Sequence, residues 1–216
     1  PAPGFLEGLR SACDAAGALL VFDEVITGFR LARGGAAERF GVTPDLWCFG
    51  KVIGGGLPVG AFGGRWDVME HLAPLGGVYQ GGTLSGNPLA MAAGRTTLEL
   101  LDDGAFDRLA ATTARLAAGL ADAFTTAGLA SVLPRVGSLL GIYFGDVAPS
   151  DFDEAKALAE NGLYPMVFHA LLERGVALAP GAYEAMFPSL AHSDAVVDET
   201  AEVAGAAAEA VVADLS

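Results

Sequence analysis

The sequence predicts an α/β fold in which a mostly parallel sheet is flanked by helices, followed by a small α+β C-terminal unit. Two observations favour the α/β fold. Residues 18–22 and 45–49 are short and almost continuously apolar, which is typical of strands in a parallel sheet. Helical stripes of apolar residues alternate with these strands, as α/β proteins require. Residues 102–104 (Asp-Asp-Gly) then mark a hinge, so we expect one unit over 1–103 and a second over 104–216.

Local signals place the individual elements. Gly17 ends the first helix, Pro88 suits the first turn of another, and Ser193 is a good N-cap for the last. We expect helices over 4–16, 36–40, 67–72, 88–101, 105–127, 153–160, 164–174 and 193–215, and strands over 18–22, 45–49, 61–64, 131–136, 139–144 and 176–179. A continuous apolar strand is expected to be buried on both faces.

Composition excludes several classes of partner. The chain has 216 residues and a formal net charge of −14, which argues against nucleic acid and anionic membranes because both favour basic surfaces. No apolar run is long enough for a membrane span and the first residues do not form a signal peptide, so we expect a cytoplasmic protein. Cys13 and Cys48 lie in apolar contexts and are expected to be reduced core residues. The three histidines are far apart, so no metal site is expected.

Lys51 is the first candidate for chemistry. It is one of only two lysines and lies between Phe49 and the glycines Gly54, Gly55 and Gly56. Apolar neighbours would desolvate its ammonium, lower its pKa and favour the free amine that forms a Schiff base with a carbonyl. The glycines permit positive φ angles and close approach of a planar group. The alternative is a lysine at a strand end that reaches solvent while the glycines form a turn.

Asp23 is the second candidate, because it ends the first predicted strand as Lys51 follows the next one. Ligands bind at the carboxyl ends of strands in open α/β sheets. A Schiff-base amine opposite a carboxylate that keeps a ring nitrogen protonated is the pair that pyridoxal phosphate needs. The alternative is that Asp23 caps a helix. Residues 80–87 add backbone amides, hydroxyls and a helix start, which suit a phosphate.

Three segments resemble motifs of the class III aminotransferases. Residues 20–30 (LVFDEVITGFR) resemble the cofactor-aspartate segment, residues 50–61 the Schiff-base lysine segment, and residues 79–94 the phosphate segment. The resemblance covers nearly the whole chain and implies the large domain of a fold-type-I enzyme, with pyridoxal 5'-phosphate as cofactor. Ile26 and residues 179–193 are most similar to the glutamate-1-semialdehyde aminomutases of that family.

This resemblance implies roles for individual residues. Lys51 would form the Schiff base and shuttle protons, Asp23 would pair with the pyridine nitrogen, and Val25 would pack against the ring. Gly82 and Thr83 would bind the phosphate. In the family the residue at Thr83 reaches the cofactor of the neighbouring subunit, which implies a homodimer with a shared active site.

The implied reaction is an isomerisation of glutamate 1-semialdehyde, a small amino-aldehyde, to the tetrapyrrole precursor 5-aminolevulinate, in which the pyridoxamine form of the cofactor donates the amine. Glu184 would face an ammonium of the diamine intermediate, unless it is a surface carboxylate. One alternative is a class III ω-aminotransferase, against which Ile26 and Glu184 argue. Another is a non-catalytic scaffold homologue, against which Lys51, Asp23 and Thr83 argue.

Members of the family carry a large portion before the position of Pro1, with a second phosphate segment, substrate-carboxylate contacts and a gating loop. We therefore expect this chain to be a C-terminal part of such an enzyme and to be inactive alone.

Overall fold

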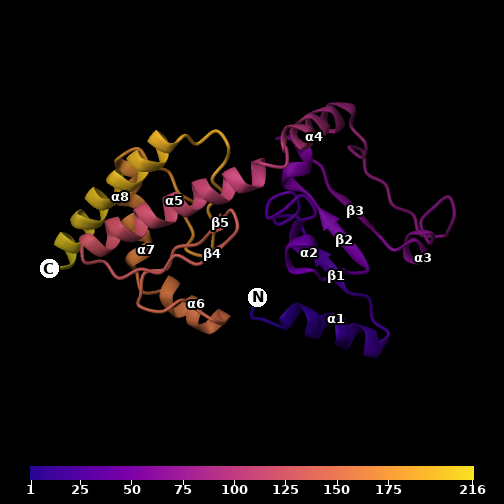
Figure 1. The fold of residues 1–216 in the computed structure, drawn as a ribbon, viewed down its shortest axis with the longest axis horizontal. Helices are drawn as coiled ribbons and strands as arrows, with labels where there is room; N and C mark the ends of the chain where they lie inside the picture. The colour runs from indigo at the N-terminus through magenta and orange to yellow at the C-terminus, as the bar shows by residue number, and fades with distance from the viewer. The chain divides into compact units, whose positions relative to one another are not determined.

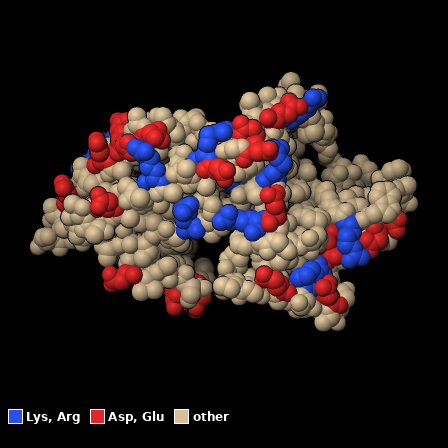
Figure 2. Space-filling model, viewed as in Figure 1, with Lys and Arg blue, Asp and Glu red and all other residues tan.

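The computed structural model describes residues 1–216, which form two compact units (Figure 1). Unit 1 comprises Pro1–Phe106 and unit 2 comprises Asp107–Ser216. No helix in either unit combines the length and the apolar character that crossing a membrane requires. Acidic side chains are spread over both units, and many basic side chains lie beside acidic ones (Figure 2).

Unit 1 is built on a three-stranded sheet with the order β1-β2-β3. Its elements are α1 (Phe5–Ala16), β1 (Val21–Asp23), α2 (Gly35–Phe40), β2 (Leu46–Phe49), the 3-10 turn η1 (Lys51–Gly54), β3 (Ala61–Gly64), α3 (Trp66–Met69) and α4 (Pro88–Leu100). Strands β1 and β2 are parallel, with Asp23 opposite Cys48, whereas β3 is antiparallel to β2, with Ala61 opposite Phe49. The short connection from β2 to β3 permits antiparallel pairing, because a parallel pair needs a longer crossover.

A small hydrophobic core covers one face of β1. Leu20, Phe22 and Val42 are buried and pack with partly buried side chains that include Leu6 of α1. On the other face Val21 is 50% exposed. The expectation that this strand is buried on both faces is therefore wrong for this chain, because successive side chains alternate and only one face is covered. Both cysteines are free and partly buried, in agreement with the sequence prediction.

Asp45, just before β2, binds groups from three other segments of unit 1. Its buried carboxylate accepts hydrogen bonds from the amide of Leu20 at 2.7 Å, from Arg10 at 2.8 Å and from Arg65 at 2.7 Å. The amide of Leu20, followed by the two guanidinium groups, holds the pKa of Asp45 well below its usual range. The carboxylate thereby fastens α1 and the segment after β3 to the same strand end.

Unit 2 has a helical core beside a two-stranded hairpin. Its elements are α5 (Ala105–Thr126), which starts at the unit boundary, β4 (Arg135–Val136), β5 (Leu139–Leu140), α6 (Phe152–Ala159), α7 (Leu163–Glu173) and α8 (Asp194–Leu215). Phe124 of α5 meets Phe144 edge to face, with ring centroids 5.3 Å apart. Fully buried alanines of α8, such as Ala204, allow close helix packing. Arg115 of α5 binds Asp198 of α8 at 2.6 Å.

Most predicted elements are confirmed within a few residues, but the strand expected over 176–179 is wrong. Val176 and Leu178 pack against the core, yet this segment is not part of a sheet. The carbonyl of Ala179 accepts a hydrogen bond from the hydroxyl of Tyr164 at 2.7 Å. A side chain thus satisfies a backbone group that a neighbouring strand would otherwise have to satisfy.

Candidate active site

The carboxyl ends of β1 and β2 bring Asp23 and the lysine segment to one edge of the sheet. Asp23 and Cys48 are register partners, and the amide of Glu24 donates to the carbonyl of Cys48 at 2.9 Å. Val25 continues from β1 and packs beside Gly50, where an added Cβ would lie 3.2 Å from the Val25 side chain. Since Lys51 follows Gly50, Asp23 and Lys51 leave the sheet at the same edge.

The carboxylate of Asp23 is exposed and held by a local turn. Its Oδ1 accepts a hydrogen bond from the amide of Val25 at 3.0 Å, in the manner of aspartates that bond to backbone two residues ahead. The alternative, in which Asp23 caps a helix, therefore does not apply to this structure. One oxygen is oriented by the turn, and the second oxygen is open to solvent or a ligand.

Lys51 has an unusual backbone conformation. Its φ angle is 48°, in the left-handed region that costs a non-glycine residue about 1–2 kcal/mol. Such strain concentrates at functional sites. The side chain of Lys51 is exposed, so the expected desolvation by Phe49, Val52 and Ile53 is not seen. The reason is that Val52 and Ile53 turn into η1 and are themselves only partly buried.

The turn that carries Lys51 packs directly on α4. A Cβ added at Gly94 of α4 would overlap the carbonyl oxygen of Ile53. Gly55 has a φ of 57°, and a Cβ there would lie 2.5 Å from the carbonyl oxygen of Ala93. Sequence reasoning missed this contact, although a glycine inside a helical pattern often has a packing reason.

Gly82 and Thr83 lie in the exposed loop between α3 and α4. The loop closes with a hydrogen bond from the amide of Ser85 to the carbonyl of Gly82 at 2.9 Å. The amide and the hydroxyl of Thr83 have no protein partner, so both are available to an anion. At the helix start, the side chain of Asn87 accepts hydrogen bonds from the Leu89 and Ala90 amides at 3.0 and 3.3 Å, so these two amides already have a partner.

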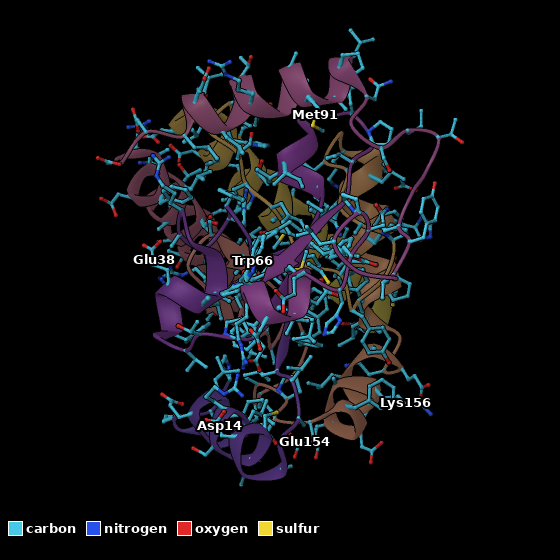
Figure 3. All side chains as sticks on the ribbon, turned by 90° about the vertical axis from the view of Figure 1, so that its right-hand side faces the viewer. Asp14, Glu38, Trp66, Met91, Glu154 and Lys156 are labelled. Atoms are coloured by element: carbon cyan, nitrogen blue, oxygen red, sulfur yellow. The ribbon has the colours of Figure 1, made fainter.

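A hollow of about 1260 Å³ lies beside this loop. It is lined by Gly82 together with residues of β2, β3 and α4, including Met91, which is labelled on α4 in Figure 3. Lys51, Asp23 and Thr83 do not line it. The structure thus brings Asp23, Val25 and Lys51 together, and it places Gly82 and Thr83 on a separate loop of the same unit.

Glu184 belongs to unit 2. It is exposed in a turn where its amide donates to the carbonyl of Gly181 at 3.1 Å. Burial, and to a smaller extent the negative charge of Glu184, raises the pKa of Tyr164, so the carboxylate lies near that hydroxyl. No group of three or more His, Cys, Asp or Glu side chains is placed to hold a metal ion.

Sequence reasoning also missed Glu24. Its side chain is 1% exposed and accepts hydrogen bonds from Thr27 and from the amides of Ala36 and Ala37. The available signal was alternation, since the residue after an exposed strand-end aspartate points to the opposite, buried face.

Comparisons with known proteins identify the family of this chain. The profile of the family described as Aminotransferase class-III matches residues 1–205. A glutamate-1-semialdehyde 2,1-aminomutase from Syntrophobacter fumaroxidans is 58% identical over 207 residues, covering 95% of this chain and 47% of the relative. The corresponding enzyme from Desulforudis audaxviator is 54% identical, covering 94% and 47%. The chain thus spans about half the length of the curated relatives it matches.

Solved structures of similar fold include enzymes of the same family. An ω-transaminase from Sphaerobacter thermophilus has a TM-score of 0.85 and 34% identity, covering 97% of this chain and 48% of the other. A glutamate-1-semialdehyde aminomutase from Pseudomonas aeruginosa in complex with PMP has a TM-score of 0.82 and 27% identity, covering 100% and 49%. The chain belongs to the class-III aminotransferase family and has the α/β fold of these pyridoxal-phosphate enzymes.

Proposed function

We propose that the polypeptide carrying this sequence is a pyridoxal-phosphate-dependent aminomutase that converts glutamate 1-semialdehyde to 5-aminolevulinate. The observation that supports it most is the placement of Asp23 and Lys51 at one sheet edge, within a chain 54–58% identical to aminomutases of that name. In this proposal residues 1–103 are the C-terminal part of the large cofactor-binding domain and residues 104–216 form a small C-terminal domain.

The residues at the sheet edge fit pyridoxal phosphate. Asp23 offers an exposed carboxylate whose orientation is set by the Val25 amide. Lys51 offers an exposed amine, and Gly50 lets Val25 pack closely beside the lysine segment because it has no side chain. When bound, the cofactor supplies an aldehyde that condenses with amines and a ring that accepts electrons from the substrate carbon.

Each of these residues has one task in the proposed mechanism. Lys51 would hold the cofactor through its side-chain amine, and the free amine would move a proton to or from the substrate. Asp23 holds a proton on the pyridine nitrogen through the charge of its carboxylate. Val25 packs on the ring and excludes water from that face. Gly82 and Thr83 bind the phosphate, with the unpartnered amide and hydroxyl of Thr83 as donors.

Glu184 is the proposed contact for the substrate. Its exposed carboxylate would bind an ammonium group of the reacting amino-aldehyde. If Glu184 is instead a surface carboxylate, Glu184→Gln leaves turnover unchanged.

A homodimer is part of the proposal. Large apolar side chains are exposed around the Thr83 loop: Trp66 at the start of α3 (Figure 3) is 69% exposed, Leu75 69%, Tyr79 85% and Leu89 71%. Exposed apolar surface of this kind indicates a contact, either with a second copy or with the part of the relatives' length that this chain does not span. A second copy would cover it and bring Thr83 to the partner's cofactor. We also infer a cytoplasmic location, which cell fractionation would test.

Product analysis tests the function directly. The full polypeptide, of which we expect this chain to be a C-terminal part, is incubated with pyridoxamine phosphate and glutamate 1-semialdehyde, with no keto acid present. The proposal predicts 5-aminolevulinate, and no product from the Lys51→Ala variant. Amine transfer to a keto acid, without isomerisation, would instead establish an ω-aminotransferase, which the structural similarity to the Sphaerobacter thermophilus enzyme favours. A protein that binds no cofactor would be the scaffold homologue.

A further inference from the structure

Glu24 is a buried carboxylate directly after the exposed Asp23. Successive residues of a strand point to opposite faces, so the Glu24 side chain enters the protein while that of Asp23 faces outward. Removing a carboxylate from water is costly unless hydrogen bonds replace the lost hydration. The buried carboxylate of Glu24 therefore needs hydrogen-bond donors within the protein.

The side chain of Glu24 fastens the segment after β1 to the start of α2. Its Oε2 accepts from the hydroxyl of Thr27 at 2.6 Å and from the amide of Ala36 at 2.7 Å, and its Oε1 accepts from the amide of Ala37 at 2.9 Å. These amides belong to the first turn of the helix, where backbone donors have no helical partner. Gly35, with a φ of 67°, has no room for a Cβ beside the carboxylate.

The backbone of Glu24 is held as well. Its amide donates to the carbonyl of Cys48 in β2 at 2.9 Å, and its carbonyl accepts from the amide of Gly28 at 2.9 Å. The next amide in the chain, that of Val25, is the donor that orients Asp23 at 3.0 Å. The direction of the Asp23 carboxylate therefore depends on a peptide segment that Glu24 fixes at both its backbone and its side chain.

We propose that Glu24 is a positioning residue for Asp23: by anchoring the segment after β1 to α2, it fixes the carboxylate that faces the pyridine nitrogen of the cofactor. This inference rests on the proposed function, because only that function gives Asp23 a ring nitrogen to meet. Glu24 itself touches neither cofactor nor substrate. It acts by fixing the orientation of the Asp23 carboxylate. Small errors in the orientation of a catalytic group lower an enzyme's rate substantially.

The chain offers a matched control in the same segment. Glu38 of α2 (Figure 3) is exposed, and its carboxylate accepts a hydrogen bond from the amide of Gly34 at 2.6 Å. Glu38→Gln makes the same chemical change as Glu24→Gln, but it alters no contact of the segment between Asp23 and Thr27. Thr27→Val is a milder test, because it removes one donor to Glu24 and leaves the carboxylate in place.

The experiment compares these three variants with the parent polypeptide. In Glu24→Gln one oxygen still accepts, but the NH₂ group that replaces the other oxygen meets a backbone amide donor of Ala36 or Ala37, so at least one of the anchoring hydrogen bonds is lost. We expect a dissociation constant for pyridoxal phosphate raised about tenfold or more, a shifted pH dependence of the bound cofactor's absorbance, and a kcat that falls by a larger factor than KM rises. Thr27→Val should give a smaller change in the same direction, and Glu38→Gln should match the parent.

Circular dichroism and thermal unfolding separate positioning from a merely structural role. If Glu24→Gln lowers the Tm but keeps the absorbance, the dissociation constant and kcat of the parent, the inference is overturned. If Glu24→Gln does not fold, Thr27→Val decides, and parent-like cofactor absorbance in that variant overturns the inference. Failure of the proposed function has a different signature: cofactor binding by the parent would be absent or unaffected by Lys51→Ala, and the positioning role would fall with it.

Discussion

The carbonyl oxygen of Ile53 lies directly against the α-carbon of Gly94, so that the turn carrying Lys51 rests on the backbone of α4. Two backbones can approach this closely only where a side chain is absent. Helix α4 therefore fixes the position of the turn that carries Lys51. The same helix begins where the predicted phosphate loop, residues 80–87, ends.

Gly94→Ala should displace this turn. The added methyl group overlaps the Ile53 carbonyl, so we expect a loss of about 1–3 kcal/mol in the free energy of unfolding and weaker binding of pyridoxal phosphate. Urea denaturation and cofactor titration measure the two effects. Gly8→Ala in α1 is the control, because its Cβ meets open space, and it should stabilise the protein by about 0.5–1 kcal/mol. Equal behaviour of the two variants would contradict the proposed packing role.

The backbone strain at Lys51 predicts that glycine is more stable than alanine at this position, the reverse of their order in a helix. At a φ of 48°, Lys51→Gly should be more stable than Lys51→Ala by about 1 kcal/mol, because glycine adopts the left-handed region without a steric cost. Lys156 in α6 supplies the comparison, since Lys156→Gly should there be less stable than Lys156→Ala by about 1 kcal/mol. Urea unfolding of the four cofactor-free variants checks this, and the same order at both sites would argue against strain at Lys51.

The Asp45 cluster predicts a specific loss of stability in acid. Because the folded state depresses the pKa of Asp45, its stabilising contribution is complete above about pH 4, where the unfolded-state carboxyl is ionised. That contribution is lost as the pH falls toward the folded-state pKa. Asp45→Asn should therefore lower the Tm clearly at pH 7. The difference in Tm between this variant and the parent should become smaller below about pH 4.

Asp67→Asn is the matched control for Asp45. It also removes a partner of Arg65, at 2.6 Å, but the Asp67 side chain is 60% exposed. Exposed ion pairs contribute about 0–1 kcal/mol, so this variant should stay close to the parent. A gap between parent and Asp45→Asn that is the same at pH 3 and pH 7 would contradict the role given to Asp45.

The sequence predicted much of this fold because its signals are local. Pro88, Gly17 and Ser193 mark helix ends, and the structure has α4 starting at Pro88, α1 ending before Gly17 and α8 capped by Ser193. The strand expected over 176–179 was wrong: the amide of Val176 donates to the carbonyl of Leu171 at the end of α7, and the carbonyl of Ala179 accepts from the distant hydroxyl of Tyr164. Such long-range hydrogen bonds leave no trace in local periodicity.

In the candidate site, too, some features follow from local sequence and others from long-range contacts. Parallel strands predict that Asp23 and Lys51 share an edge, since this follows from strand order alone. The exposure of Lys51 depends on how the segment after β2 folds back, which tertiary contacts decide and residue types alone do not predict. The burial of Glu24 could have been predicted from the alternation of side chains after Asp23, and the capping of α4 from an asparagine directly before Pro88.

The most direct test of the account is to trap the cofactor on the protein. The polypeptide is loaded with pyridoxal phosphate, reduced with borohydride and digested, and the modified residue is located by mass spectrometry. Because this sequence has two lysines, Lys51 and Lys156, the answer within it is unambiguous. We expect a pyridoxyl group on Lys51, and no such label in Lys51→Ala. A label on Lys156, or an unlabelled Lys51 in a protein that holds the cofactor, would contradict the role proposed for Lys51.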